Sequence, residues 1–159
     1  MSSDTGDIVL PPLSHIGFVV EDIENTTKLL SPVLGIGPWE IFEAKLKKEE
    51  MLEGEPCTLN VARSSLGSIL IELIQTVEGK SVWAEFLETK GEGIHHIAYS
   101  VSNWDDRASK IKQQGCTMLI GGIAPNGKRW AYFRVNPGGI IVEFEEMSDE
   151  GKPTLTLES

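Results

Sequence analysis

Two adjacent histidines, His95 and His96, stand in a run of strand-forming residues, and imidazole rings suit metal binding and proton transfer. Side chains alternate between the two faces of a β-strand, so the two rings are expected on opposite faces. We expect His96 to line a cavity and His95 to be a packed or surface histidine. One histidine alone is more often structural than functional, so its partners must be found elsewhere in the chain.

The segment that contains His96 resembles an earlier segment of the same chain, which indicates an internal duplication. "SHIGFVVEDIE" (residues 14–24) aligns with "HHIAYSVSNWD" (residues 95–105), and the alignment places His15 on His96. In both segments small and apolar residues follow the histidine. Each half of the chain therefore offers one histidine at the same place on a predicted strand.

A second pair of segments adds a carboxylate to each half. "GSILIELIQ" (residues 67–75) aligns with "GGIIVEFEE" (residues 138–146), so that Glu72 falls on Glu143. Each glutamate lies between apolar residues of a predicted strand, where an unpaired carboxylate is costly to bury. A partner for each carboxylate is therefore expected.

Two histidines and two glutamates at matching positions predict a shared metal site. Period-2 alternation puts His15 and His96 on the face away from the apolar residues, and puts Glu72 and Glu143 opposite the helix-facing side chains. Imidazole and carboxylate together bind Zn²⁺, Co²⁺, Ni²⁺, Mn²⁺ or Fe²⁺, and four protein ligands leave one or two positions open for substrate or water. The alternative is a satisfied histidine and a salt-bridged glutamate in each half. The recurrence of both residue types favours the metal site.

The elements that must position these residues follow the same order twice. Alternation, capping residues and glycines predict one βαβββ module over about 13–76, with a helix from Asp22 to Gly35, and a second over about 93–147. A short amphipathic helix over 81–90 joins them. The fold class is α+β, and residues 1–159 are expected to form a single domain. The polar segment 47–56 and the tail from Ser148 are expected to be solvated and to carry no site.

Composition limits the classes of partner. Asp and Glu number 24 against 14 Lys and Arg, and the net charge of −10 disfavours nucleic-acid binding. No apolar run is long enough to span a membrane, and the N-terminus lacks the pattern of a signal peptide, so we expect a cytoplasmic protein. The cysteines Cys57 and Cys116 are expected to be free thiols.

These residues resemble the vicinal oxygen chelate superfamily, which includes glyoxalase I, extradiol dioxygenases and bleomycin-resistance proteins. The resemblance covers roughly residues 13–147. "LSHIGFVVEDIE", "SVWAEFLETKGEGIHHIAYSV" and "GGIIVEFEE" are most similar to the methylmalonyl-CoA epimerase branch, and the helix followed by "GEGIHH" is the most specific of these motifs. The resemblance implies two tandem modules that form a cupped, incompletely closed, eight-stranded mixed sheet.

The resemblance also implies the roles of individual residues. It implies a divalent metal bound by four ligands: His15, Glu72, His96 and Glu143. Glu143 is the candidate base that removes the α-proton of an acyl-CoA thioester, which gives a metal-stabilised enolate. Lys128 and Arg129 are candidate contacts for the CoA group. A homodimer is expected.

One residue of the family pattern is missing from this sequence, and its absence leaves other functions open. Epimerisation needs a second acid or base, yet the third strand of the first module (58–67) carries no carboxylate. The loop glutamates before it are expected to be solvated. The alternatives are a glyoxalase I-type lyase (lactoylglutathione lyase-like) and a non-enzymatic small-molecule-binding protein. An extradiol dioxygenase is disfavoured, because its Fe²⁺ takes two histidines and one glutamate.

Overall fold

The computed structural model describes residues 10–135 and 139–147. The N-terminus, Gly138 and the tail predicted to be solvated lie outside the described residues. The helices and strands of the described part are β1 (Leu13–Val19), α1 (Ile23–Leu34), β2 (Glu40–Leu46), a 3₁₀ turn (Lys48–Glu50), β3 (Met51–Glu53), β4 (Cys57–Leu66), β5 (Ile69–Glu78), α2 (Val82–Lys90), β6 (Gly93–Val101), α3 (Trp104–Gln113), β7 (Thr117–Ile123), β8 (Arg129–Val135) and β9 (Ile140–Glu146).

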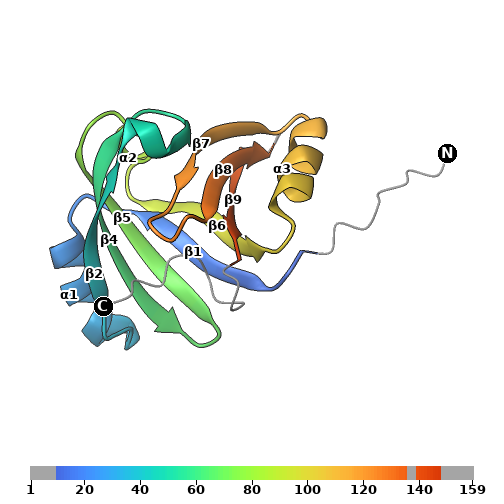
Figure 1. Cartoon of the computed structure of the whole chain (residues 1–159). Helices are drawn as coiled ribbons and strands as arrows, with labels where there is room; N and C mark the ends of the chain where they lie inside the picture. The colour runs from blue at the N-terminus through green and yellow to red at the C-terminus, as the bar shows by residue number, and fades with distance from the viewer. Residues whose placement is uncertain (1–9, 136–138, 148–159) are drawn as a thin grey trace.

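One curled mixed sheet contains all nine strands of the described residues, in the order β2-β4-β5-β1-β6-β9-β8-β7-β3. The first strands of the two halves, β1 and β6, pair antiparallel at its centre, and each also pairs in parallel with the last strand of its own half, β5 or β9. In Figure 1 these strands cross in the middle of an open half-barrel. The predicted fold class, α+β with a cupped and incompletely closed sheet, is confirmed.

Two helices cover the outer face of the sheet, as the alternation of apolar residues predicts. Under α1, Ile16 and Phe18 of β1 pack with Ile71 and Leu73 of β5. Under α3, the corresponding residues of β6, β8 and β9 form a second cluster, in which Phe133 is fully buried. These helices lie on opposite sides of the molecule in Figure 1. The outer face therefore carries the apolar core and leaves the concave face for polar chemistry.

The ends of α1 agree with the predicted helix from Asp22 to Gly35. The carboxylate of Asp22 accepts a hydrogen bond from the backbone N–H of Asn25 at the start of α1, and Gly35 ends that helix with a positive φ of 67°. Ser81 caps α2 in the same way. Asn103 precedes α3, but its side chain makes no capping hydrogen bond. No helix among the described residues is long and apolar enough to cross a membrane.

The helix α2 fills the concave side. Its Trp83 is 1% exposed and packs in the inner cluster with Leu59, Ile74 and Tyr132. This cluster joins strands of both halves, so the helix between the halves also fixes the two walls of the half-barrel against each other.

The prediction of eight strands is wrong by one, because the segment 47–56 is not merely solvated. Met51 and Glu53 of β3 pair with Gly122 and Gly121 of β7. The chain thus passes from β2, at one edge of the sheet, to the opposite edge. Edge strands carry unpaired backbone groups, and β3 satisfies those of β7.

The predicted opposite orientation of His95 and His96 is also wrong. The pairing of β1 with β6 slips between Gly17, opposite His96, and Phe18, opposite Ile94, so His95 is the extra residue of a β-bulge. A bulge re-aims side chains, and here the two Nδ1 atoms lie 3.1 Å apart. His95 is a buried, packed histidine, but it belongs to the concave face.

Candidate metal centre

Four donor side chains meet on the concave face where the two halves join. His15, Glu72, His96 and Glu143 each offer one ligand atom, and these atoms all lie within 4.8 Å of one another. The four come from β1, β5, β6 and β9, the four central strands of the sheet. All four side chains are buried.

Small residues on the strands between the donors leave room for this convergence. Gly17 lies between Glu72 and His96 in the pairing, and Ala98 lies between Glu143 and His15. A Cβ on Gly17 would lie 1.9 Å from Cε1 of His96, so that ring occupies the space above a missing side chain. In each half, a small residue thus lies between that half's glutamate and the histidine of the other half.

The distances between donor atoms suit a single cation. Oε2 of Glu143 lies 3.0 Å from Nε2 of His15 and 3.1 Å from Nε2 of His96. The two Nε2 atoms lie 3.2 Å apart, and Oε1 of Glu72 lies 3.6 Å from each. Bonds of about 2.0–2.2 Å around a tetrahedral or octahedral ion place neighbouring donors roughly 2.8–3.6 Å apart.

The charges around the centre also favour a bound cation. Three carboxylates of the described residues are buried together here, those of Glu72, Glu143 and Glu145, with one guanidinium, that of Arg63. With both histidines neutral, as ligands of a cation must be, these groups leave negative charge in excess in a place shielded from water. A divalent cation would balance that excess, so the residues present fit such an ion.

Arg63 orients one of the carboxylates. Its Nε donates to Oε2 of Glu72 at 2.8 Å, and its Nη2 donates to the same oxygen. Oε1 of Glu72 is the oxygen that faces both histidines. Arg63 thus holds one oxygen and directs the other toward the ligand cluster, which is how residues behind a metal site tune its ligands.

The second half carries Tyr132 at the corresponding place, next to Glu143 in the pairing. Its ring stacks on His96 with centroids 4.5 Å apart, and its hydroxyl lies 3.5 Å from Nε2 of His96. Burial raises the pKa of Tyr132 well above its usual value, so the phenol stays protonated.

Glu145 is the most unusual carboxylate of the site. It is fully buried, and neither of its oxygens has a hydrogen-bond partner among the described residues. Its Oε1 lies 3.8 Å from Nη2 of Arg63 and 4.0 Å from Nδ1 of His15, the nitrogen turned away from the other donors. Burial and the nearby Glu143 carboxylate raise its pKa to about 7.

The ligand side chains stabilise one another's charged forms. Burial lowers the pKa of His96, but hydrogen bonds to Glu143 and Glu72 outweigh it and raise the pKa to about 9. The pKa of His15 is raised by the same carboxylates against the effect of burial. Burial raises the pKa of Glu143, yet its hydrogen bonds with the two histidines hold it below the usual value. Protons and a cation therefore compete for the same atoms.

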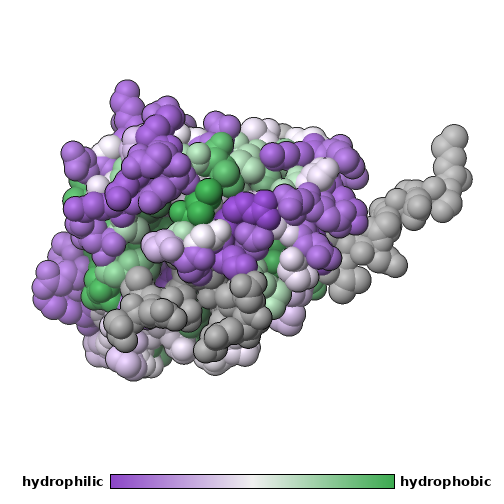
Figure 2. All heavy atoms as spheres, in the orientation of Figure 1, coloured by the Kyte–Doolittle hydropathy of each residue, from purple (hydrophilic) through white to green (hydrophobic). Residues whose placement is uncertain are grey.

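A cavity of about 200 Å³ opens at this centre. Its walls include Arg63, Glu72 and Glu143 beside Trp130 and Tyr132, and its rim includes residues of β2 and of the β7–β8 connection. Figure 2 shows hydrophobic residues gathered in the middle of this face of the molecule, between hydrophilic margins. A small substrate in this cavity would contact both carboxylates and the apolar wall.

The residues predicted to contact CoA lie elsewhere. Arg129 pairs with Asp105 of α3 at 2.7 Å and with Glu146 at 2.8 Å, and its guanidinium lies 5.4 Å from the ring centre of Trp104. These contacts turn Arg129 toward α3. Neither Arg129 nor Lys128 lines the cavity, and their predicted role in binding a substrate stays a prediction.

Sequence reasoning overlooked Arg63 and Glu145. Alternation alone places Glu145 on the same face as Glu143, two residues before it, and this signal was available. Arg63 could not be found in the same way, since its role depends on its pairing with Glu72 on the neighbouring strand.

Comparison with solved structures gives folds of the same kind. Methylmalonyl-CoA epimerase from Mycobacterium tuberculosis is 21% identical and superposes with a TM-score of 0.65, over 89% of this chain and 91% of that one. The E43L variant of the Streptomyces coelicolor epimerase, in complex with 2-nitronate-propionyl-CoA, is 22% identical, with a TM-score of 0.66 over 91% and 99% of the two chains. At these identities the likeness shows the fold alone.

Sequence comparison shows the family. The uncharacterized protein YqjC of Bacillus subtilis (strain 168) is 30% identical over 137 residues, which are 84% of this chain and 91% of that protein. The profile of the glyoxalase/bleomycin resistance protein/dioxygenase superfamily matches residues 14–133. With the duplicated half-barrel and its central His/Glu cluster, this match establishes that the chain belongs to the glyoxalase/bleomycin resistance protein/dioxygenase superfamily.

Proposed function

We propose that the protein is a metal-dependent epimerase of methylmalonyl-CoA or a closely related 2-acyl-CoA thioester. The observation that carries the proposal is the convergence of two histidines and two glutamates beside a cavity that both glutamates line. The epimerase folds described above support the substrate class, and one of them holds a CoA thioester analogue. The ligands would be the ones that the sequence predicts: His15, Glu72, His96 and Glu143.

A divalent cation held there would supply positive charge that stabilises the negative charge developing on the thioester oxygen when the α-proton leaves. The chain itself must remove that proton. Glu143 lines the cavity, and a cation held beside it would keep its carboxylate ionised, as the two histidines do without the cation. In the proposed step its oxygen takes the proton, and the electron pair of the broken C–H bond moves onto the thioester.

Arg63 and Tyr132 would support this step from the wall of the cavity. Arg63 keeps Glu72 fixed, so that Glu143 is the carboxylate that can shift toward the substrate. Tyr132 keeps a protonated hydroxyl beside His96 and closes the apolar side of the cavity.

Exchange of the α-proton and full epimerisation make different demands on the protein. Exchange needs one base, whereas epimerisation needs a second group to protonate the opposite face. Residues 57–66 form β4, which lines the cavity with Leu59, Val61 and Arg63 and supplies no carboxylate. Measuring the rates of exchange and of epimerisation separately therefore distinguishes the role of Glu143 from that of the second group.

The test is the exchange of the α-proton of methylmalonyl-CoA in deuterated water, with Co²⁺ or Mn²⁺ added and the product followed by mass spectrometry. Wild-type protein is expected to catalyse exchange, and Glu143→Gln is expected to lower the rate by at least 100-fold. Glu78→Gln, at the exposed end of β5, is the matched control and is expected to keep the wild-type rate.

No exchange with any divalent cation would refute the epimerase, and full activity of Glu143→Gln would refute Glu143 as the base. Turnover of methylglyoxal with a thiol, in the absence of exchange, would assign the glyoxalase I-type lyase instead. The expected homodimer is a separate prediction, which sedimentation velocity tests.

A further inference from the structure

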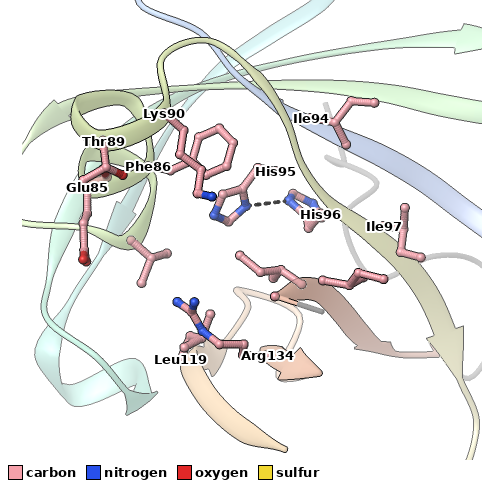
Figure 3. A pocket seen from close by; sticks show the side chains of 14 residues that line it. Glu85, Phe86, Thr89, Lys90, Ile94, His95, His96, Ile97, Leu119 and Arg134 are labelled. Carbon is pink, nitrogen blue, oxygen red and sulfur yellow. Dashed lines mark hydrogen bonds between the residues drawn. The ribbon is translucent and has the colours of Figure 1, made fainter. Parts of the chain in front are cut away.

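A second cavity, of about 560 Å³, lies between α2 and the strands of the second half, and its lining includes His95 and His96. Phe86 and Ile141 are among its apolar lining residues, and Lys90, His95 and Arg134 supply its nitrogen groups. Figure 3 shows these three side chains pointing into the same space from α2, β6 and β8. The proposed reaction makes no use of this cavity.

His95 presents an unpaired nitrogen to this cavity. The side chain is 5% exposed, it packs edge-to-face on Phe86, and its Nε2 has no hydrogen-bond partner among the described residues. A buried polar nitrogen without a partner is costly, and native structures leave few of them. A hydrogen-bonding group bound in this cavity would satisfy Nε2.

The hydrogen bond between the two histidines decides what that group must be. The Nδ1 atoms of His95 and His96 lie 3.1 Å apart, so one carries the proton and the other accepts it. His96 directs Nε2 at the ligand cluster, and an imidazole that offers Nε2 to a cation carries its proton on Nδ1. Nδ1 of His95 then accepts, and the proton of His95 is on Nε2. The cavity faces an N–H donor, which needs an acceptor.

The charges around the cavity favour an acceptor with negative charge. Lys90 and Arg134 both line it, and neither forms an ion pair with a carboxylate of the described residues. Glu85 is the one carboxylate among the described lining residues. Two cations and one N–H donor against one carboxylate are notable in a chain with a net charge of −10.

We propose that this second cavity binds a small amphipathic anion, a carboxylate joined to an apolar chain. The carboxylate accepts the Nε2–H of His95 between Lys90 and Arg134, and the chain packs on the apolar wall that includes Phe86 and Ile141. Binding also holds His95 in the tautomer that accepts from His96. The anion therefore supports His96 as a cation ligand, and the two ligands bind with positive cooperativity.

Octanoate is the probe, and isothermal titration calorimetry on the whole chain is the measurement. Octanoate is expected to bind at least tenfold more tightly than 1-octanol, which lacks the charge, or acetate, which lacks the chain. Its affinity is expected to fall at least tenfold in Lys90→Ala/Arg134→Ala and in His95→Phe. Lys112→Ala, on the exposed surface of α3, is the matched control and is expected to bind octanoate normally.

Equal binding of 1-octanol and octanoate, or no loss in Lys90→Ala/Arg134→Ala, would overturn the anion site. Nitrogen-15 NMR of the imidazoles gives a readout that does not depend on folding of the variants. It is expected to show the proton of His95 on Nε2 and a shift of that resonance on adding octanoate. A proton on Nδ1 of His95 would overturn the argument. The cooperativity is checked by the Kd of Co²⁺, which saturating octanoate is expected to lower several-fold.

Discussion

At the scale of single residues, Gly17 and the ring of His96 have the tightest fit in the site. An added Cβ would lie 1.9 Å from Cε1 and 2.3 Å from Nε2 of that ring, so the ring must turn away if the position is not glycine. The three atoms nearest to such a Cβ all belong to the His96 ring. Glycine is thus required at position 17 by the space that the His96 ring occupies, and not by the backbone conformation.

Gly17→Ala is therefore expected to weaken Co²⁺ binding by roughly 10–100-fold, the range seen when the support of a metal ligand is lost. Calorimetric titration measures the affinity. Gly67→Ala is the control, since a Cβ there meets no atom within 4 Å, although its φ of 62° strains the backbone. Wild-type affinity in Gly17→Ala would show that His96 is not a ligand.

Arg63 supplies buried positive charge to the carboxylates of the site when no cation is bound. It is the buried cation that faces Glu72 and Glu145, and Arg63→Ala would leave both carboxylates buried without it. We expect a loss of about 3–5 kcal/mol in the free energy of unfolding, measured by urea denaturation without metal. Arg63→Lys keeps the charge and is expected to lose less. A loss below about 1 kcal/mol in Arg63→Ala would contradict this account.

At the scale of elements, Arg129 ties α3 to the end of the sheet. Its guanidinium bridges Asp105 of α3 and Glu146 of β9, and it also donates to Glu146 through Nε. The hydrogen bonds from Arg129 hold the pKa of Glu146 below its usual value. This part of the stability is therefore present above the pKa of Glu146 in the unfolded chain and is lost as the pH falls through its lowered folded pKa.

Arg129→Ala is expected to lower the free energy of unfolding by about 1–2 kcal/mol at pH 7, and by less at pH 3.5. Urea denaturation of wild type and variant at both pH values gives the comparison. An equal loss of unfolding free energy at the two pH values would mean that Arg129 does not stabilise the protein through its ion pairs with these carboxylates. Lys112→Ala, on the same helix, serves as the control.

At the scale of the whole molecule, the candidate metal centre joins the two halves. Its ligands come from both, and a cation bound only by the folded protein adds about 2.7 kcal/mol at 100 times its Kd. For a domain of this size that corresponds to a rise in Tm of roughly 5–10 °C. Differential scanning calorimetry with Co²⁺ is expected to show this rise in wild type and none in His15→Ala/His96→Ala. An equal rise in both proteins would place the ion elsewhere.

The sequence by itself determined the duplicated order of elements and the face on which the four ligands lie. Side chains alternate between the two faces of a strand with a fixed period. Once the apolar face of a strand is known, the face of every other residue on that strand follows. His15 and Glu72 could thus be matched to His96 and Glu143, and the structure brings these four together. The start and end of α1 could also be predicted from the local sequence, because Asp22 and Gly35 cap the helix that they flank.

Only the tertiary structure decided what depends on neighbouring strands. The bulge that turns His95 toward His96 arises from a slip in pairing between β1 and β6. Arg63 acts through Glu72 on another strand, and β3 finds its place on β7, far along the chain. Pairing register and strand order are set by the total burial of apolar surface over the whole sheet, and no single segment carries that information.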